Sequence, residues 1–292
     1  MSGFFIYLVT DMYKLIADSG STKTDWVLLK GKQVVKTVNT IGFNPYFQSK
    51  DQISLEIVNS LKPYLLEYQH AITELHYYGA GCSTFDNCTM LENVLTINLN
   101  VPRIFVQHDL LAAARALCKK SEGIACILGT GSNSCLYNGK TILENVPSVG
   151  YLWGDHGSGA QIGKTLVAYY FDGKLSSDLK YEFESEGYDR EEILNNVYKK
   201  NMPSKYLASL SRFISKHTAH PQIQEILESC FDSFFKMQIN HYSNSKKHKV
   251  NIVGSIGYVY LDQLTKAAKQ NGYEIGLVIK SPIEGLIDYH SS

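Results

Sequence analysis

The sequence has 292 residues, of which 44% are hydrophobic and 19% are charged, a balance typical of a globular protein with a large core. Lysine plus arginine and aspartate plus glutamate each number 28, so the net charge is zero. No overall charge draws the chain to nucleic acid or to an anionic membrane, and we expect neither as a partner.

The first eleven residues contain an apolar run, Phe4 to Val9, which is too short to span a membrane and lacks the cationic start of a signal peptide. Met12 directly precedes the first recognisable strand, so we interpret residues 1–11 as an extension from an upstream start. The six cysteines include no C-x-x-C pair, and several stand in apolar stretches, as expected for reduced thiols. We therefore expect a cytoplasmic protein.

The first predicted elements surround a glycine-containing turn. An apolar strand at 15–17 leads into DSGSTKTDW at 18–26, and strands at 26–29 and 33–38 follow. Asp18, at the end of its strand, can hold a hydrated Mg²⁺ ion. The turn could bind a phosphate group through small residues, hydroxyl groups and a lysine, namely Ser19, Gly20, Ser21, Thr22, Lys23 and Thr24. An ordinary polar hairpin turn is the alternative.

Further along, the pattern predicts a loop at 42–47 (GFNPYF), a helix at 52–68, a strand at 74–78, a short helix and a strand at 103–106. Asp109 then stands at the start of a strongly helical run at 110–119. Asp109 either caps this helix or acts as a general base that takes the proton of an attacking hydroxyl group, and the two roles are compatible.

After this helix the pattern restarts. A strand at 123–128 enters GTGSNS at 129–134, and a second hairpin follows, about 110 residues after the first. Its candidate phosphate-binding residues are Gly129, Thr130, Gly131 and Ser132. A duplicated α/β unit with such a turn in each copy predicts two domains with a nucleotide between them. We expect domains at 1–118 and 119–292, with the last few residues packed back on the first.

The remaining sequence begins with GYLWGDHGSG at 150–159, where four glycines surround Asp155. A carboxylate held in this way suits hydrogen bonds to sugar hydroxyl groups, although a structural loop is the alternative. His156 could bind a ligand, cap the next helix or simply be exposed. The segment 164–235 is mostly helical, a strand at 251–253 leads into GSIGYVY at 254–260 and a helix, and a last strand lies at 273–279.

Five segments in this order resemble the N-acetylglucosamine kinase branch of the BadF/BadG/BcrA/BcrD ATPase family: DSGSTKTDW, GTGSNS, GYLWGDHGSG, GSIGYVY and KSPIEG at 280–285. The resemblance extends from residue 13 to the end. It implies an α/β fold of two ribonuclease-H-like (actin-like ATPase) domains that close over Mg-ATP in the cleft between them. The implied activity is ATP-dependent phosphorylation of an amino sugar, N-acetylglucosamine to its 6-phosphate.

The resemblance also implies roles for single residues. Asp109 would be the catalytic base, Asp18 would support Mg²⁺ through water, and Thr22 and Thr130 would contact phosphates. The adenosine side would be held by Gly254 and Ser255, and the sugar by Asn44, Gly150, Tyr151 and Asp155. The family loop usually reads G-D-E-G-S, whereas this chain has His156 in place of the glutamate, so the preferred sugar could differ.

Two other functions remain open. One is an ATPase that activates a partner protein through an iron–sulfur cluster, but Cys126 lies inside an apolar strand and the second turn is not of the G-G-Q-D type. The other is a non-catalytic sensor of sugar or nucleotide. The sequence leaves open whether the chain forms a homodimer.

Overall fold

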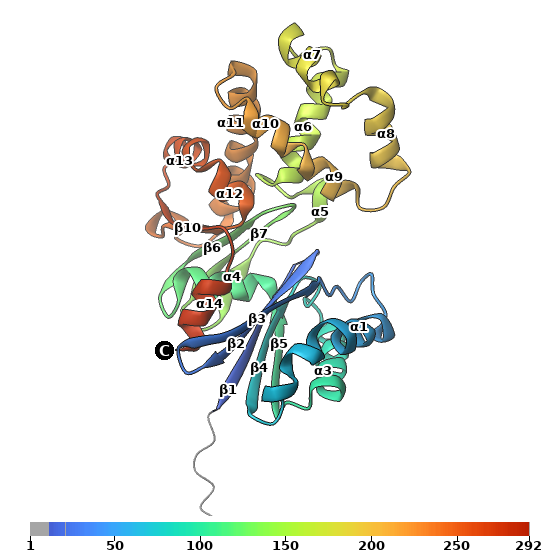
Figure 1. Cartoon of the computed structure of the whole chain (residues 1–292). Coiled ribbons are helices and arrows are strands. Elements are labelled where there is room, and N and C mark those ends of the chain that lie inside the picture. Colours follow the sequence, from blue (N-terminus) through green and yellow to red (C-terminus); the bar gives the residue numbers. More distant parts are fainter. Residues whose placement is uncertain (1–11, 21, 292) are drawn as a thin grey trace, which may run out of the picture. The chain divides into compact units, whose positions relative to one another are not determined.

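The computed structural model describes residues 12–20 and 22–291, so Ser21 and the interpretation of residues 1–11 as an upstream extension lie outside the described residues. The chain forms two compact units (Figure 1). Unit 1 holds the described residues up to Ala116 together with the segment from Pro282 onward, and unit 2 runs from Leu117 to Ser281. The sequence had placed the boundary between 118 and 119, with only a return of the last residues to the first domain.

Unit 1 is built on a five-stranded sheet in the order β3-β2-β1-β4-β5. The first three strands are antiparallel neighbours, and β1, β4 and β5 run parallel. Gly31, with a φ of +59°, makes the tight turn between β2 and β3. The strand bounds are β1 Tyr13–Ser19, β2 Lys23–Lys30, β3 Gln33–Ile41, β4 Ile72–Gly79 and β5 Arg103–His108.

The helices of unit 1 cover both faces of this sheet. Helices α1 (Lys50–Glu56) and α3 (Phe85–Leu99) lie together on one side of it (Figure 1). Successive side chains of a strand point to opposite faces of the sheet. Helix α14 (Ile283–His290) contacts the other face, where the hydroxyl oxygen of Tyr78 on β4 lies 2.8 Å from His290 Nε2. Helix α4 (Asp109–Cys118) follows β5 directly.

Two helix predictions needed correction. The helix expected at 52–68 begins at Lys50 and changes to a π-helical turn at Ile57–Leu61 before α2 (Lys62–Leu65) and a 3₁₀ turn at Leu66–Tyr68. Pro63 has no N–H group to donate to the carbonyl four residues earlier, so a regular α-helix cannot continue unchanged through it. The helix expected to be short is the 15-residue α3, capped by Thr84.

Unit 2 repeats the same arrangement with the order β10-β9-β6-β7-β8. Its first three strands again pair antiparallel, while β6, β9 and β10 run parallel. This confirms the restart of the pattern and the α/β fold class with two units. The strand bounds are β6 Glu122–Leu128, β7 Ser132–Asn138, β8 Ile142–Asn145, β9 Val250–Val253 and β10 Ile275–Ile279.

The helices of unit 2 follow largely from the predicted helical segment. They bury a core rich in phenylalanine, including Phe183, Phe213, Phe231 and Phe234. The helices are α5 Gly150–Trp153, α6 Gly159–Phe171, α7 Ser177–Ser185, α8 Arg190–Tyr198, α9 Pro203–Ser209, α10 Ser211–Lys216, α11 Pro221–Met237, α12 Ser255–Val259 and α13 Leu261–Gln270.

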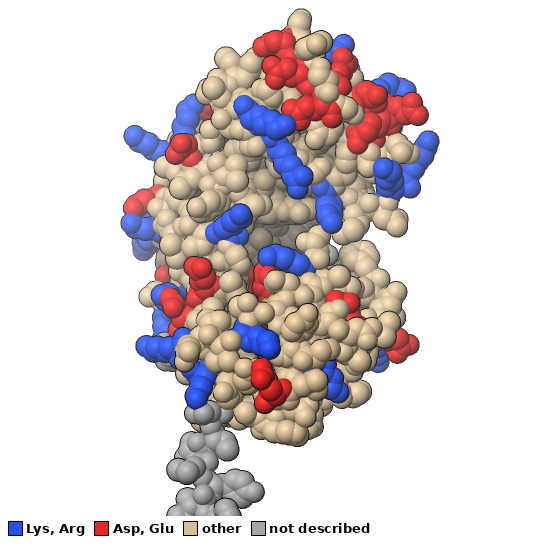
Figure 2. All heavy atoms as spheres, viewed as in Figure 1, with Lys and Arg blue, Asp and Glu red and all other residues tan. Residues whose placement is uncertain are grey.

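The surface carries charges of both signs. Figure 2 shows basic and acidic side chains interspersed on one face, with acidic ones gathered where α7 and α8 lie, among them Glu182, Glu184, Glu191 and Glu192. Within residues 12–20 and 22–291, no helix combines the length and the apolar character needed to cross a membrane. All six cysteines are free thiols, and five of them are buried.

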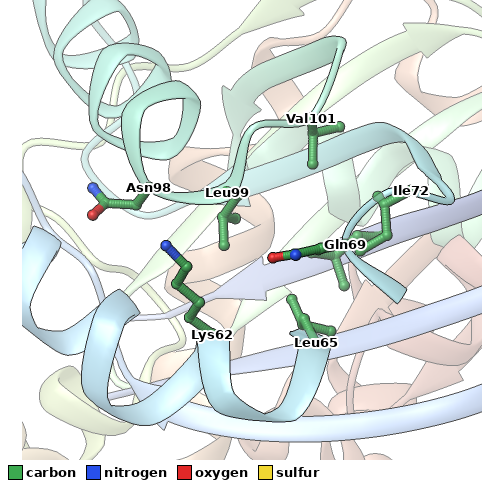
Figure 3. Close-up of a pocket in the computed structure, with 8 residues that line it drawn as sticks. Lys62, Leu65, Gln69, Ile72, Asn98, Leu99 and Val101 are labelled. Carbon is green, nitrogen blue, oxygen red and sulfur yellow. The ribbon is translucent and has the colours of Figure 1, made fainter. Parts of the chain in front are cut away.

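A small cavity lies inside unit 1, between the C-terminal turn of α3 and the segment around Lys62 (Figure 3). Its volume of about 10 Å³ has room for roughly one water molecule. A nucleotide or sugar cannot enter a space of this size, so the functional site must be sought at the surface of the units.

Candidate functional site

The candidate residues of unit 1 gather at the carboxyl edge of its parallel strands. Ser19, Gly79 and His108 are paired side by side at the ends of β1, β4 and β5. Asp18 therefore lies one residue inside this edge, and Asp109 lies one residue beyond it, at the first turn of α4. Ligands of open α/β sheets bind outside the carboxyl ends of such strands, so this edge is suited to chemistry.

The two aspartates influence each other electrostatically. Burial is the main cause that raises the pKa of Asp18 to about 7, and the negative charges of Asp109 and Asp25 add to it. Burial also raises the pKa of Asp109, although the neighbouring His108 and backbone N–H groups oppose this effect. His108 Nδ1 lies 3.0 Å from Asp109 Oδ1 and also accepts the N–H of Leu110 at 3.0 Å. His108 thus shares the N-terminal end of α4 with Asp109, whose carboxyl group also meets backbone N–H groups there.

The first turn divides into buried and exposed residues. The hydroxyl groups of Ser19 and Thr24 are fully buried and bond to each other at 2.8 Å, and Ser19 also accepts the N–H of Phe43. These two hydroxyl groups therefore hold the hairpin and the loop at 42–47 together. The N–H of Gly20 closes the turn on the carbonyl of Lys23.

The exposed part of this turn consists of Gly20, Thr22 and Lys23. The Lys23 ammonium group is 2.8 Å from Asp25 Oδ2, and Asn39 donates to the other oxygen of the same carboxylate. Thr22 and Gly20 therefore present the open surface of the turn, and Lys23 is partly neutralised by Asp25.

Asn44 lies in the same unit and is oriented by its neighbours. Its Oδ1 accepts the N–H of Tyr46 at 3.0 Å, and its own N–H donates to Gln48 at 2.7 Å. Gly81, with a φ of +84°, packs so closely that a Cβ atom there would lie 2.5 Å from Asn44 Oδ1. The Nδ2 group of Asn44 donates to no atom of the described residues, which leaves it available for a ligand.

The second turn is anchored in unit 2 by three neighbours. Asp155 Oδ1 accepts the N–H of Ser132 at 3.1 Å. The first N–H groups of α6, from Gly159 and Ala160, donate to the carbonyls of Gly129 and Thr130 at 2.9 and 3.0 Å.

After these bonds, two donors of the second turn remain. The N–H of Gly129 is used on the carbonyl of Gly131 at 3.0 Å, whereas the N–H groups of Thr130 and Gly131 donate to nothing in the described part of the chain. Thr130 is exposed and Gly131 half-buried, so both can reach a ligand. Successive free N–H groups of this kind form an anion-binding surface.

The loop at 150–159 supports the second turn through Asp155. Asp155 is 8% exposed, and its backbone has a φ of +54°. Burial raises the pKa of its carboxyl group, while hydrogen bonds from Ser132 and Ser148 oppose the rise. Gly150 is exposed, and the carbonyl of Tyr151 accepts from Lys164 at 2.8 Å.

His156 has a role outside those considered from the sequence. The ring is half-buried, and its Nδ1 bonds to Ser233 of α11 at 2.7 Å. This bond ties the loop at 150–159 to α11.

Gly254 and Ser255 lie beside the second turn. Gly254 has a φ of +129°, and a Cβ atom there would lie 2.2 Å from the carbonyl oxygen of Leu128. Only glycine allows this approach of the two strand ends. Gly254 and Ser255 therefore share the carboxyl edge of the unit 2 sheet with Gly129–Ser132, and Ser255 is exposed there.

Comparison with solved structures decides the family. The chain matches a protein from Porphyromonas gingivalis that carries the provisional name N-acetylglucosamine kinase, with a TM-score of 0.90 and 38% identity over 95% of this chain and 98% of that one. The chain belongs to the same family of actin-like ATPases. The resemblance inferred from the sequence motifs is thereby confirmed.

More distant structures share the actin-like fold of this family. A protein from Chromobacterium violaceum, provisionally named as an N-acetylglucosamine kinase, has a TM-score of 0.71 and 16% identity over 96% of this chain and 99% of that one. The ethanolamine utilization protein EutJ from Carboxydothermus hydrogenoformans has a TM-score of 0.53 and 14% identity over 96% and 89%. No protein-family model and no curated protein matches the chain.

Several residues around the family's site had not been expected from the sequence. Gly81 orients Asn44 and His108 lies at the start of α4, and neither residue had been assigned a role from the sequence. Gln238 bonds to Ser132 from more than 100 residues away, and no local signal marks it. Asp25 could have been found, because a strand pair places it directly across from Asp18.

Proposed function

We propose that this protein is an ATP-dependent sugar kinase and that it phosphorylates the 6-hydroxyl group of an amino sugar, N-acetylglucosamine. The observation that carries the proposal is the pair of carboxyl groups, Asp18 and Asp109, that stand together at the carboxyl edge of the unit 1 sheet. The 38% identity to a provisionally named N-acetylglucosamine kinase supports the substrate class. The assignment to the BadF/BadG/BcrA/BcrD branch rests on the five motifs.

Asp109 would act as the general base. Its carboxylate takes the proton of the sugar hydroxyl group while the hydroxyl oxygen forms a bond to the γ-phosphorus of ATP. The bond from that phosphorus to the bridging oxygen breaks, and ADP leaves with the electron pair. Because burial raises the pKa of Asp109, this carboxylate is a stronger base than an exposed aspartate.

The carboxyl groups of this edge fit a bound Mg²⁺ ion. Asp25 and Asp109 repel the Asp18 carboxylate, and a divalent cation would relieve the repulsion that helps to raise the pKa of Asp18 to about 7. Within residues 12–20 and 22–291, no three His, Cys, Asp or Glu side chains are placed to coordinate a metal ion directly. Asp18 would therefore hold the ion through water. When bound, Mg²⁺ neutralises charge on the phosphates.

Each unit by itself offers further candidate contacts. In unit 2, the free N–H groups of Thr130 and Gly131 would receive a phosphate, with Gly254 and Ser255 toward the adenosine. In unit 1, Asn44 Nδ2 would contact the sugar, and Thr22 a phosphate. Gly150 and Tyr151 stay candidates for sugar contacts, whereas we assign the Asp155 carboxylate chiefly to holding the second turn.

The experiment that tests the proposal is a substrate screen. Purified protein with Mg-ATP is given N-acetylglucosamine, N-acetylmuramic acid, N-acetylmannosamine or glucose, and both ADP release and the mass of the sugar product are measured. We expect the highest kcat/KM and a sugar phosphate with N-acetylglucosamine. Release of ADP without any sugar phosphate would contradict the proposal and favour an ATPase that drives a partner protein.

Assembly and location complete the proposal. We propose a protein that acts in the cytoplasm on small molecules, without a nucleic-acid or membrane partner, and we leave a homodimer as the assembly to be tested. Sedimentation of the purified protein with and without ATP measures its mass directly. A mass that stays at the 32.8 kDa of one chain would exclude the dimer.

A further inference from the structure

A chain of buried polar side chains runs beneath the second turn in unit 2. Gln238, at the C-terminal end of α11, donates from Nε2 to the hydroxyl oxygen of Ser132 at 3.0 Å, and its Oε1 accepts from Ser134 at 3.3 Å. Ser134 in turn lies 2.7 Å from the hydroxyl group of Tyr242, whose oxygen accepts the N–H of Val146 at 3.1 Å. All four side chains are nearly inaccessible, with exposed fractions of 0 to 6%.

The orientation of the Gln238 amide group sets the direction of the hydrogen bonds along these side chains. The amide Oε1 of Gln238 can only accept, so Ser134 gives its single hydroxyl hydrogen to it. Tyr242 must then be the donor to Ser134.

The row of hydrogen-bonded side chains ends at Ser132, the residue that closes the second turn. Ser132 is held through its side chain by Gln238 and through its backbone N–H by Asp155. Both attachments lie on the inner side of the turn, and they leave the N–H groups of Thr130 and Gly131 as its unused donors. A donor pair that is already fixed in place binds an anion without first losing conformational freedom.

We propose that Gln238 is a positioning residue for the phosphate-binding turn. Tyr242, Ser134 and Gln238 form an oriented hydrogen-bonded chain that fixes Ser132, and through it the N–H groups that receive a phosphate of ATP. The inference rests on the proposed function, because it assigns those N–H groups to ATP. It adds a residue that touches neither ATP nor sugar and lies more than 100 positions from the turn.

The test replaces Gln238 with methionine, which has a similar shape but neither donates nor accepts as an amide does. We expect the Kd of ATP, measured by calorimetry on the full chain, to rise about tenfold, the size expected for losing an ordinary buried hydrogen-bond connection. The KM for ATP should rise by a similar factor, while kcat at saturating ATP and the KM for N-acetylglucosamine change less than twofold. A residue that only stabilises the fold would not produce this division.

A matched pair of tyrosine variants provides the control. Tyr242→Phe removes the far end of the chain, and Tyr273→Phe removes a hydroxyl group of the same unit that bonds instead to Asn240 at 2.8 Å and Ser245 at 3.0 Å. We expect Tyr242→Phe to weaken ATP binding about threefold to tenfold and Tyr273→Phe to leave it within twofold. This pair carries the test alone if Gln238→Met does not fold by circular dichroism.

A double-mutant cycle connects Gln238 to Ser132. If the two act as one connection, Ser132→Ala combined with Gln238→Met should weaken ATP binding no more than the stronger single change. If wild type binds ATP and the Gln238→Met variant binds it with the same Kd, the inference about Gln238 is wrong while the proposed function is unaffected. Wild-type protein that binds no ATP would overturn the proposed function and this inference with it.

Discussion

The carboxyl edges of the two sheets share a strand order but differ in the chemistry they carry. In unit 1, Asp18 and Asp25 face each other across the hairpin one step before the turn, and in unit 2 the same step holds Ile127 and Asn133. Asp109 adds a third carboxyl group to the first edge. The second edge offers backbone N–H groups instead, and its one acidic side chain, Asp155, is turned inward to hold the turn.

The difference shows how a duplicated unit can divide a reaction. Negative charge suits proton removal and a metal ion, and it repels phosphate, whereas free N–H groups attract phosphate and remove no proton. The comparison therefore predicts that changes at the first edge alter the chemical step and changes at the second alter ATP binding. Four substitutions follow in decreasing order of effect: the first two test this division, and the other two test the sugar contact and the charge of Asp18 at the first edge.

Asp109→Asn should lower kcat at least a thousandfold, because an amide cannot take the hydroxyl proton, while the Kd of ATP changes less than threefold. Steady-state kinetics and calorimetry on the same preparation measure both. Asp86→Asn, in the first turn of α3 of the same unit, is the control and should leave both values unchanged. Near-normal turnover by Asp109→Asn would remove this residue as the base.

Asp155→Ala should weaken ATP binding rather than lower kcat. The buried N–H of Ser132 loses its acceptor, so we expect the Kd of ATP to rise about tenfold and the free energy of unfolding to fall by roughly 1–3 kcal/mol. Asp172→Ala, at an exposed ion pair with Lys174 of the same unit, is the control. A variant that binds ATP normally and loses only kcat would place Asp155 in the chemical step and erase the contrast.

Gly81→Ala should raise the KM for the sugar. The new Cβ atom would lie 2.5 Å from Asn44 Oδ1 and push that side chain away, so we expect the KM for the sugar to rise about fivefold at an unchanged KM for ATP. Gly31→Ala is matched, because Gly31 also has a positive φ but no atom lies within 4 Å of its added Cβ. Equal effects from the two variants would mean that backbone strain, not Asn44, is the cause.

Asp18→Asn should change stability in a pH-dependent way. The pKa of Asp18 is about 7 in the folded protein and near 4 in the unfolded chain, so its ionisation disfavours folding. Its contribution to stability is present below pH 4 and is lost as the pH rises through 7. At pH 8, Asp18→Asn should be more stable to urea than wild type by about 1–2 kcal/mol, and below pH 4 the gain should vanish.

Added Mg²⁺ separates this effect from a general one. The ion should stabilise wild type at pH 8 and stabilise Asp18→Asn less, because the variant lacks the carboxylate that would hold the ion through water. If Asp18→Asn is less stable than wild type at pH 8, the ionised Asp18 carboxylate stabilises the folded protein, which contradicts this prediction.

Most strands and both turns could be predicted because their signals are local. Apolar strands of regular length, Gly31 and the two turn segments are all read within a few residues, and the restart of the pattern is visible in the sequence. The place of Asp109 at the start of a helix that directly follows a strand was predicted in the same way. The inward direction of Ser19 could also have been found, since it follows Leu15 and Ala17 on the inner side of β1.

The supporting residues could not be predicted, because their contacts cross the sequence. Gln238 meets Ser132, and His156 meets Ser233, over separations that no local pattern reports. Asp155 was expected to face a sugar because its loop is rich in glycine. Its position against Ser132 depends on how α6 packs on the turn, which only the folded unit shows.

Calorimetric titration of ATP into wild type, Asp109→Asn and Asp155→Ala tests the division of work between the two edges most directly. We predict that Asp109→Asn binds ATP as wild type does and that Asp155→Ala binds it about tenfold more weakly. Weakened binding by Asp109→Asn together with unchanged binding by Asp155→Ala would contradict this prediction.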